Sequence, residues 1–327
     1  MTYDEAKSKF EQLFSGKLDK EDARNLLIDM AKRGESADEI AAAAEVMRAH
    51  SVKLPVSDDL RQKLIDNCGT GGDKSGSFNI SSTVSLLLAG AGCYVAKHGN
   101  RSITSKSGSA DMLETLGIKL DLSPQQQVKM LEETGFTFIF AIHHHPAMKF
   151  IMPIRKSIDH RTIFNILGPL SNPADVRKQL IGVFDTSFVK KVAEALKRLG
   201  TKSAMVVSSR DGLDEISLSD VSEAVSLKDG TLSSLTIDPT EFGIKRSTLE
   251  EIKGGDATLN ASITKGILEG EIEGAKRDIV LINAAAALIV DGQARDFQDG
   301  LQIAKETIDS GRAKEALKKI IKVSNSL

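Results

Sequence analysis

The feature that most constrains the fold is a regular alternation of short apolar runs with helix-length segments, which begins near Lys63. The apolar runs are residues 64–65, 93–96, 136–142, 180–184 and 204–207. The helix-like segments that follow them lie near residues 81–90, 107–116, 124–134 and 187–199. Strands that alternate with helices of roughly 10–15 residues are typical of a largely parallel sheet. The sequence therefore predicts an α/β fold with a mostly parallel central sheet flanked by helices.

The first 50 residues predict three helices and no strand. Thr2 with Glu5, and Ser36 with Glu39, have the spacing of a capping box. In that motif the hydroxyl and the carboxylate satisfy each other's backbone donors. Apolar residues recur at helical intervals between the two motifs, which indicates helices packed on one another. This segment is expected to form a small helical bundle.

The length of 327 residues predicts two domains, at roughly 150 residues for each. We expect a small all-helical domain over residues 1–64, completed by helices from about residues 146–175. A large α/β domain is expected over residues 65–327. Its C-terminal third holds two more long helical segments and a Lys-rich last helix.

The charge balance limits the partners of this chain. Lys and Arg total 43 against 45 Asp and Glu, a net charge of −2 that attracts neither nucleic acid nor an anionic membrane. The two cysteines, Cys68 and Cys93, are too few for a disulfide framework. The N-terminus has no apolar stretch of the kind a secretion signal needs, and no apolar run reaches the roughly 18 residues of a membrane span. We expect a cytoplasmic protein without nucleic-acid or membrane partners.

The most informative segment is residues 66–82, DNCGTGGDKSGSFNISS, in which a strand leads through glycines into a helix. Glycines let backbone N–H groups approach an anion, and a helix N-terminus adds a favourable dipole. A Walker A loop would need Gly in place of Cys68 and Asp73, and the dinucleotide fingerprint would need Gly in place of Lys74. The segment therefore predicts phosphate binding of another kind, with a simple tight turn as the alternative.

A second polar loop, residues 97–109, directly follows the apolar run 93–96. It offers three cations, a histidine, an amide and five hydroxyls. Loops beyond the carboxyl ends of parallel strands line the ligand crevice of an α/β sheet. This density of donors favours phosphate binding over the alternative, a solvated loop.

Asp214 and Glu215 also follow an apolar run, in the sequence RDGLDEIS. Magnesium is usually held by one or two carboxylates together with substrate phosphates. The pair alone is also compatible with surface solvation, and it gains weight from the two anion-binding loops.

The run His143-His144-His145 does not favour zinc. On an extended segment consecutive side chains point to opposite faces, and no cysteine pair is nearby. One or two of these rings are expected to face a pocket as neutral hydrogen-bonding groups. Arg155, further along, is a candidate bidentate clamp for a carboxylate, or alternatively a cation on a helix surface.

Taken together, these segments resemble the anthranilate phosphoribosyltransferase family over almost the full length. The motifs that carry the resemblance are GTGGD (69–73), FNIS (78–81), KHGNR (97–101), SKSGSADMLETLG (105–117), HHHPAMK (143–149), RTIFNILGPLSNP (161–173) and GLDEIS (212–217). The resemblance implies binding of phosphoribosyl pyrophosphate, anthranilate and Mg²⁺, and a homodimer.

The resemblance also implies the roles of individual residues. The positions that match the family's phosphoribosyl pyrophosphate contacts are Gly69, Gly72, Asp73, Ser77, Asn79, Ile80, Ser81, Ser82, Lys97, His98, Gly99, Asn100, Arg101, Ser102, Ile103, Thr104, Ser105 and Ser109. The magnesium ligands match Ser81, Asp214 and Glu215. The anthranilate contacts match Gly69, Asn100 and Arg155, with His98 and His145 near the same pocket. One departure is Asp159-His160, where the family usually has Gly and a β-branched residue, and it affects the helix end after Arg155 and the shape of the anthranilate pocket.

The implied reaction transfers the 5-phosphoribosyl group to the amino nitrogen of anthranilate in tryptophan biosynthesis and releases pyrophosphate. No single general base is assigned, because an aromatic amine is already neutral at pH 7. Two domains around one site also predict closure by a hinge, which excludes water.

Three alternatives are open at this stage. A pyrimidine nucleoside phosphorylase shares the architecture but uses inorganic phosphate and does not require the metal pair. A nucleic-acid-binding relative is expected to be basic and to lack the carboxylates. A structural protein has no reason to hold these motifs together.

Overall fold

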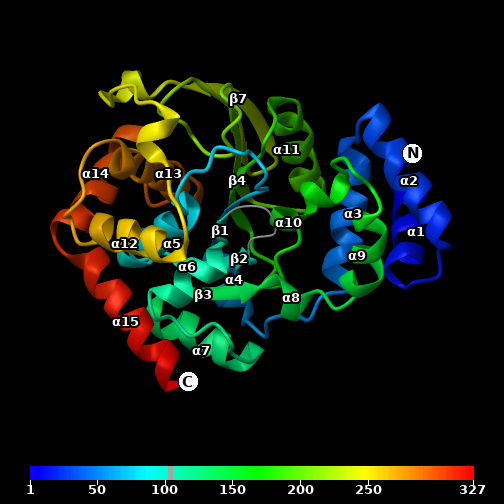
Figure 1. Cartoon of the computed structure of the whole chain (residues 1–327), viewed down its shortest axis with the longest axis horizontal. Coiled ribbons are helices and arrows are strands. Elements are labelled where there is room, and N and C mark those ends of the chain that lie inside the picture. The colour runs from blue at the N-terminus through cyan, green and yellow to red at the C-terminus, as the bar shows by residue number, and fades with distance from the viewer. Residues whose placement is uncertain (102–105) are drawn as a thin grey trace.

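The computed structural model describes residues 1–101 and 106–327, and its centre is a seven-stranded sheet with helices on both faces (Figure 1). The strands are β1 (Leu64–Gly69), β2 (Tyr94–Gly99), β3 (Phe136–Phe140), β4 (Lys178–Gly182), β5 (Ser203–Ser209), β6 (Ser222–Lys228) and β7 (Thr231–Ile237). Their order is β3-β2-β1-β4-β5-β6-β7. The first five run parallel, and β6 and β7 are antiparallel. The predicted mostly parallel sheet is confirmed.

The helices alternate with these strands and then fill the C-terminal part of the described chain. The α-helices are α1 (Tyr3–Phe14), α2 (Lys20–Arg33), α3 (Ala37–Ala49), α4 (Asp58–Lys63), α5 (Ile80–Gly90), α6 (Ser109–Thr115), α7 (Pro124–Thr134), α8 (Ala141–His144), α9 (Met148–Lys156), α10 (Leu167–Leu170), α11 (Val189–Arg198), α12 (Ala257–Leu268), α13 (Ala275–Asp291), α14 (Phe297–Asp309) and α15 (Arg312–Ser326). Short 3₁₀ turns are η1 (Ile163–Asn165), η2 (Thr186–Phe188), η3 (Pro239–Phe242) and η4 (Leu249–Ile252).

The N-terminal helices form a smaller lobe at the right of Figure 1. Both predicted capping boxes are present: Thr2 accepts from Glu5 N, and Ser36 accepts from Glu39 N. Helices α1 and α2 contact α9, and α3 contacts α10. The lobe, which we call the helical lobe, is therefore built from the N-terminal helices together with a later part of the chain.

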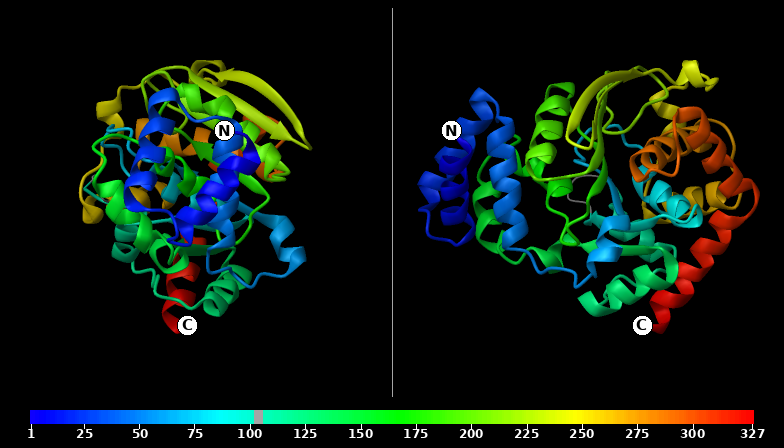
Figure 2. Two further views of the ribbon diagram at one scale, coloured as in Figure 1. Left: turned by 90° about the vertical axis from the view of Figure 1, so that its right-hand side faces the viewer. Right: turned by 180° about the vertical axis from the view of Figure 1, so that it is seen from behind.

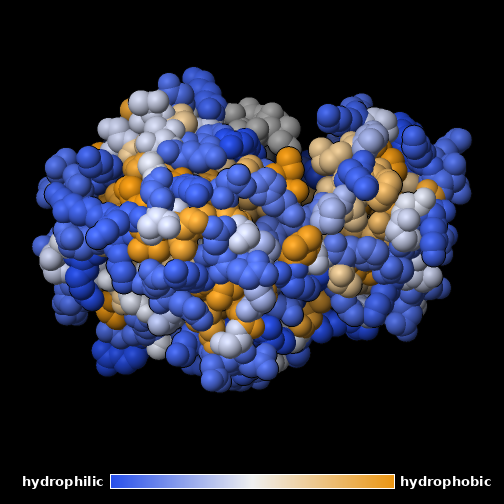
Figure 3. Space-filling view, turned by 90° about the horizontal axis from the view of Figure 1, so that it is seen from below, coloured by the Kyte–Doolittle hydropathy of each residue, from blue (hydrophilic) through white to orange (hydrophobic). Residues whose placement is uncertain are grey.

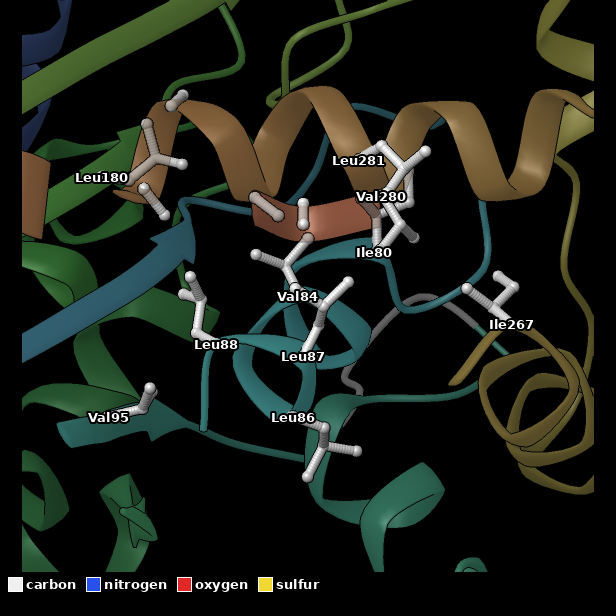
Figure 4. Packing of buried hydrophobic residues seen from close by; sticks show 14 of the residues in the cluster. Ile80, Val84, Leu86, Leu87, Leu88, Val95, Leu180, Ile267, Val280 and Leu281 are labelled. Atoms are coloured by element: carbon white, nitrogen blue, oxygen red, sulfur yellow. The ribbon is translucent and has the colours of Figure 1, made fainter. Parts of the chain in front are cut away.

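A large core lies on the opposite side of the sheet, beneath α5 and α13. Figure 4 shows part of it, where Val84 and Leu88 of α5 lie between α13 and the strand residue Val95, and Leu180 of β4 lies beside α13. Helix α5 contacts β1, β2 and α13. Because α5 begins directly after the glycine-rich segment, this packing fixes the position of that segment relative to the strands.

A second core, the shared core, joins the helical lobe to the other face of the sheet. It includes Leu27 of α2, Ala43 of α3, Val192 of α11, Ile181 of β4 and Val206 of β5. The contact between α3 and α11 is part of it. The lobe thus rests on the helix that covers the sheet.

The two views in Figure 2 show α13, α14 and α15 at the far end of the molecule from the helical lobe. The face drawn in Figure 3 is mostly hydrophilic, and a notch at its upper edge separates the smaller lobe from the larger body. No helix in residues 1–101 or 106–327 has the length and apolarity to cross a membrane.

Candidate functional site

Most candidate residues lie at or beyond the carboxyl ends of the parallel strands β1, β2 and β5. The glycine loop, residues 70–78, follows β1. Residues 97–101 comprise the last three residues of β2 and the first two residues after it. The turn that carries Asp214 and Glu215 follows β5. In parallel sheets these ends meet at one edge, which is where ligands bind in open α/β folds.

The glycine loop is shaped by backbone conformations that glycine favours. Gly71, Gly72 and Gly76 have φ of 69°, 78° and 70°, and Lys74 also lies in the left-handed region at 61°. The side chain of Asn79 makes no capping bond at the start of α5. The first N–H groups of α5 are therefore not capped by that side chain, as an anion-binding helix end requires.

The side chains at the start of α5 differ in their surroundings. The Asn79 amide instead joins neighbouring segments: its Oδ1 accepts from Asn260 Nδ2 at 2.9 Å, and its Nδ2 lies 3.4 Å from Ser107 O. Ile80 and Ser82 are buried, so they can offer a ligand only backbone groups. Ser81 is partly exposed, and Ser77 is partly exposed as well.

Lys97 points from β2 into the protein rather than into solvent and is only 1% exposed. Its Nζ donates to Asn67 O at 2.8 Å and lies 3.3 Å from Ser81 Oγ. A buried ammonium needs such partners because burial without them is costly. Lys97 therefore places a fixed positive charge directly behind Ser81.

The carboxylate pair lies against the glycine loop. Gly71 N donates to Asp214 Oδ2 at 2.6 Å. Burial and, to a smaller extent, the nearby Asp73 raise the pKa of Asp214 to about 7. The pKa of Glu215 is also raised, first by burial and then by Asp214, while Lys97 opposes the shift. Carboxyl groups held so close together disfavour each other's ionised form, and a cation would relieve this.

Two glycines make room for Asp214. A Cβ on Gly69 would lie 2.2 Å from Asp214 Oδ2, and a Cβ on Gly182 would lie 1.6 Å from Asp214 O. Neither separation is possible for real atoms. The ends of β1 and β4 therefore accept this turn only because both positions lack a side chain.

Sequence reasoning did not identify the residues that position this turn. Asn283 of α13 accepts from Ile216 N and donates to Ile216 O, both at 2.9 Å. Asp211 accepts from Ser217 Oγ at 2.6 Å and from Leu213 N at 3.0 Å. A lone Asn inside the apolar run of α13 was a usable signal, because a buried amide needs partners.

The chemistry of this donor set fits a cation that also binds phosphate. Among the described residues no group of three or more His, Cys, Asp or Glu side chains could hold a metal ion. Two carboxylates and the Ser81 hydroxyl instead match a hard ion that completes its shell with water and substrate oxygens. Within the part of the chain that the structure describes, Asp73 Oδ2 is buried without a hydrogen-bond partner. This carboxylate oxygen is therefore also available to a cation near the glycine loop.

The histidine run corrects one sequence expectation. The rings do not lie on an extended segment, because β3 ends at Phe140 and residues 141–144 form α8. Pro146 cannot donate to a continuing helix, which ends here. His144 lies between Val52 O, at 2.7 Å, and Gln127 Oε1, at 3.1 Å, and His143 is exposed beside Phe140. Of the three, only His145 reaches another candidate among the described residues.

His145 and His98 form a buried pair, with their Nε2 atoms 3.2 Å apart. His98 Nδ1 lies 3.0 Å from Gly168 O, and a carbonyl only accepts, so the proton of His98 is on Nδ1. His98 Nε2 therefore accepts from His145. Burial lowers the pKa of His98 to about 4. Burial, and to a smaller extent the neighbouring His98, lower the pKa of His145 to about 3. Both rings are neutral at pH 7.

These lowered pKa values predict a loss of stability in acid. The unfolded chain takes up protons near the ordinary imidazole pKa of 6.5 while the folded pair does not. The stabilisation is complete above pH 6.5 and is lost as the pH falls towards about 4 and about 3. His145→Gln keeps a donor towards His98 but cannot titrate. Its unfolding free energy should fall less steeply below pH 6.5, by up to about 1.4 kcal/mol per pH unit.

Urea unfolding of both proteins at steps from pH 7.5 to 4.5 measures this difference. Asp214 and Glu215 titrate in both proteins, so they cancel in the comparison. Parallel curves would show that His145 is not held neutral by the fold.

Arg155 lies on α9. It lines a cavity of about 230 Å³ with Met152, Lys156, Ile158, His160, Thr162 and Asn165. Among the described residues no carboxylate pairs with Arg155, and its guanidinium lies 5.4 Å from the Phe164 ring centre. Burial lowers its pKa. The cavity includes none of the other anthranilate candidates, Gly69, His98, Asn100 or His145.

The remaining candidates are on the loop after β2. The Arg101 guanidinium is paired with Asp111 at 2.8 Å and with Glu114 at 2.7 Å, so its charge is already matched by α6. Asn100 is exposed, and its carbonyl accepts from Ser109 Oγ at 3.1 Å. Gly99 allows this approach, since a Cβ there would lie 2.5 Å from Ser109 Oγ. The candidates Ser102, Ile103, Thr104 and Ser105 lie outside the described residues.

Comparison with known proteins identifies relatives along the whole chain. Residues 61–314 match the glycosyl transferase family a/b domain, and residues 1–51 match its helical bundle domain. The anthranilate phosphoribosyltransferase of Methanobrevibacter smithii is 46% identical over 322 residues, covering 98% of this chain and 95% of that protein. The one from Rhodopseudomonas palustris (strain TIE-1) is 45% identical over 324 residues, covering 99% and 94%.

Solved structures agree. The crystal structure of anthranilate phosphoribosyltransferase from Thermus thermophilus has a TM-score of 0.92 at 37% identity, covering 99% of this chain and 96% of that one. The Saccharomyces cerevisiae enzyme in complex with PRPP and Mg has a TM-score of 0.88 at 26% identity. The same enzyme in complex with 4-fluoroanthranilate has 0.87 at 25%. Both cover 100% of this chain and 94% of theirs. With both domains of the glycosyl transferase family and full-length relatives of one kind, this chain belongs to the anthranilate phosphoribosyltransferases.

Proposed function

We propose that this chain transfers the 5-phosphoribosyl group of phosphoribosyl pyrophosphate to the amino nitrogen of anthranilate, giving N-(5-phosphoribosyl)anthranilate and pyrophosphate. The observation that carries the proposal is the meeting of three groups at one sheet edge. These are the open glycine loop, the buried cation Lys97 and the carboxylate pair Asp214 and Glu215. The loop and Lys97 suit a pyrophosphate that gains negative charge as it leaves, and the carboxylate pair would hold the Mg²⁺ that binds it.

The leaving pyrophosphate determines the roles of the phosphate-side residues. Cleavage of the C1–oxygen bond leaves oxocarbenium character on the ribose and negative charge on the pyrophosphate. Backbone N–H groups of the glycine loop and of the first turn of α5 donate to that developing charge. Lys97 adds its charge through Ser81, which it approaches at 3.3 Å. The N–H groups of the glycine loop, those of the first turn of α5 and the Lys97 ammonium are in place before the reaction, so these groups need to move little as the charge develops.

Asp214, Glu215 and the Ser81 hydroxyl are the residues that would hold Mg²⁺. Bound there, the ion would neutralise charge on the pyrophosphate oxygens. The raised pKa values of both carboxyl groups and the unpartnered Asp73 Oδ2 indicate that, in the described part of this pocket, Lys97 alone does not balance the carboxyl groups. The S. cerevisiae relative in complex with PRPP and Mg supports the same combination.

We propose that anthranilate lies between the histidine pair and the helical lobe. Neutral His98 and His145 offer flat, uncharged surfaces that suit an aromatic ring. Arg155, without a carboxylate partner among the described residues, is available for the anthranilate carboxylate. Asn100 and Gly69 are the proposed contacts nearer C1. Positioning of the amine in line with C1 supplies much of the acceleration, and no general base is required before the bond forms.

The reaction can be followed by the fluorescence of anthranilate. With the wild-type protein the signal should fall only when phosphoribosyl pyrophosphate and Mg²⁺ are both present, and EDTA should stop the decay. Adding pyrimidine nucleosides and inorganic phosphate instead tests the phosphorylase alternative. Constant anthranilate fluorescence under the complete conditions would falsify the proposed function.

Three predictions are not tested by these observations. The division into residues 1–64 and 65–327 is supported by the contacts of α1 and α2 with α9 and of α3 with α10, which add part of residues 146–175 to the smaller unit. The homodimer and the cytoplasmic location stay predictions, and sedimentation of the purified protein is the direct check of the first.

A further inference from the structure

Arg161 lies between two regions that the proposed reaction uses. It belongs to the segment that joins α9 to η1 and therefore to the helical lobe. Its Nη2 donates to the carbonyl of Gly72 in the glycine loop. The same guanidinium lies over the ring of Phe184, a residue that closely follows β4, with Cζ 3.8 Å from the ring centre. One side chain thus contacts two separate segments and connects both to its own.

Both sides of this contact are held by further bonds. His160 Nδ1 lies 2.9 Å from Arg161 O, and Thr162 N donates to Asn165 Oδ1 at 3.0 Å. On the loop side, Phe184 N donates to Thr70 Oγ1 at 3.2 Å, and Thr70 N donates to Gly182 O at 2.9 Å. The Arg161 side chain therefore links two supported pieces of backbone.

We infer that Arg161 is a positioning residue that holds the glycine loop from the side of the helical lobe, so that the N–H groups of the loop face the phosphates. The inference rests on the proposed function for the role of the loop. A peptide group is planar, so fixing the carbonyl of Gly72 also fixes the N–H of Asp73. Without this bond, Gly71, Gly72 and Gly76 leave the loop free to adopt many conformations.

Phe184 orients the guanidinium for this task. Arginine stacks on aromatic rings through its planar face and keeps its N–H groups free at the edge. Over Phe184, that edge points to Gly72 O. Lysine can supply the charge and one donor but not the flat stacking, so it should replace Arg161 only in part.

The test uses Arg161→Ala, Arg161→Lys, Phe184→Ala and the Ala double variant. Arg161→Ala should raise the KM for phosphoribosyl pyrophosphate about tenfold, the order expected for one charge-assisted hydrogen bond. The KM for anthranilate should stay within about twofold. Arg161→Lys should recover part of the loss. Phe184→Ala should raise the same KM and add almost nothing in the Arg161→Ala background, because both changes remove one unit.

Arg198→Ala is the matched control. Arg198 also lies over an aromatic ring, with Cζ 4.0 Å from the centre of Tyr3, and it pairs with Asp38 at 3.0 Å. It joins α11 to the helical lobe as Arg161 joins the loop to that lobe, but it does not touch the glycine loop. This variant should lose stability without a change in the KM for phosphoribosyl pyrophosphate. An equal KM change in both variants would mean a general effect of the lobe and would overturn the inference.

Hydrogen exchange of the free protein separates this inference from the proposed function. Arg161→Ala should speed amide exchange in residues 70–76 without any substrate. Unchanged exchange refutes the contact as a constraint on the loop, whatever the enzyme catalyses. Faster exchange with an unchanged KM for phosphoribosyl pyrophosphate refutes its link to phosphate binding. A rise in the anthranilate KM alone would assign Arg161 to the other substrate and would also overturn the inference.

Discussion

Glu215→Gln is expected to lower kcat by a factor on the order of 10²–10³, the usual loss when one group that stabilises transition-state charge is removed. The same change should not unfold the protein. The pKa of Glu215 is raised by burial and by Asp214, so its ionised form destabilises the fold at neutral pH. The neutral amide of similar shape removes that repulsion. We therefore expect slower turnover together with an unchanged or higher melting temperature in the absence of Mg²⁺.

The two readouts are anthranilate fluorescence at saturating substrates and thermal unfolding in EDTA. Glu223→Gln is a suitable control, because Glu223 on β6 makes a surface ion pair with Arg210 and is not among the proposed metal ligands. It should leave kcat unchanged. If Glu215→Gln retained the wild-type kcat, Glu215 would have no part in holding the metal.

Gly182→Ala should have the second large effect, although Gly182 is not proposed to bind any ligand. The added Cβ would lie 1.6 Å from the carbonyl oxygen of Asp214, so the strand or the turn has to move. We expect a destabilisation of more than about 3 kcal/mol, in the range of overpacked cores and broken buried networks, and a loss of most activity. Denaturant unfolding and the fluorescence assay measure the two effects.

Gly230→Ala separates this clash from ordinary glycine strain. Gly230 has φ of 79° in the turn between β6 and β7, and nothing in the described chain lies within 4 Å of an added Cβ. It should cost about 1 kcal/mol through backbone strain and leave the reaction intact. A Gly182→Ala protein as stable and active as Gly230→Ala would show that the turn can move without consequence.

The alternation of strands and helices could be predicted, because the spacing of apolar residues and the length of each segment distinguish a strand from a helix. The segments expected near 124–134 and 187–199 are helices α7 and α11, and the apolar runs lie on β1 to β5. The antiparallel pair β6 and β7 was missed. Neither strand contains a continuous apolar run like those of the buried parallel strands, although Asp229-Gly230 between them is a typical hairpin turn.

The candidate site could be predicted by its motifs but not by its contacts. The family was correctly predicted, because seven segments in order are far more specific than any one of them. The burial of Lys97 behind Ser81, the pairing of Arg101 with α6 and the position of Arg155 in a cavity that the histidine pair does not line depend on packing between distant segments. The expectation of an extended histidine run failed for a related reason. An apolar run of seven residues does not show where its strand ends.

The shared core gives the molecule a mechanical property of its own. Because Ala43 of α3 and Val192 of α11 belong to one apolar cluster, the boundary between the lobes is interior rather than surface. Swinging the lobe away as a rigid body would wet that interior, at about 25 cal/mol for each Å² uncovered. Sliding of packed helices keeps the same surface dry. The fold therefore favours closure by shear over the hinge closure that the two-domain sequence predicts.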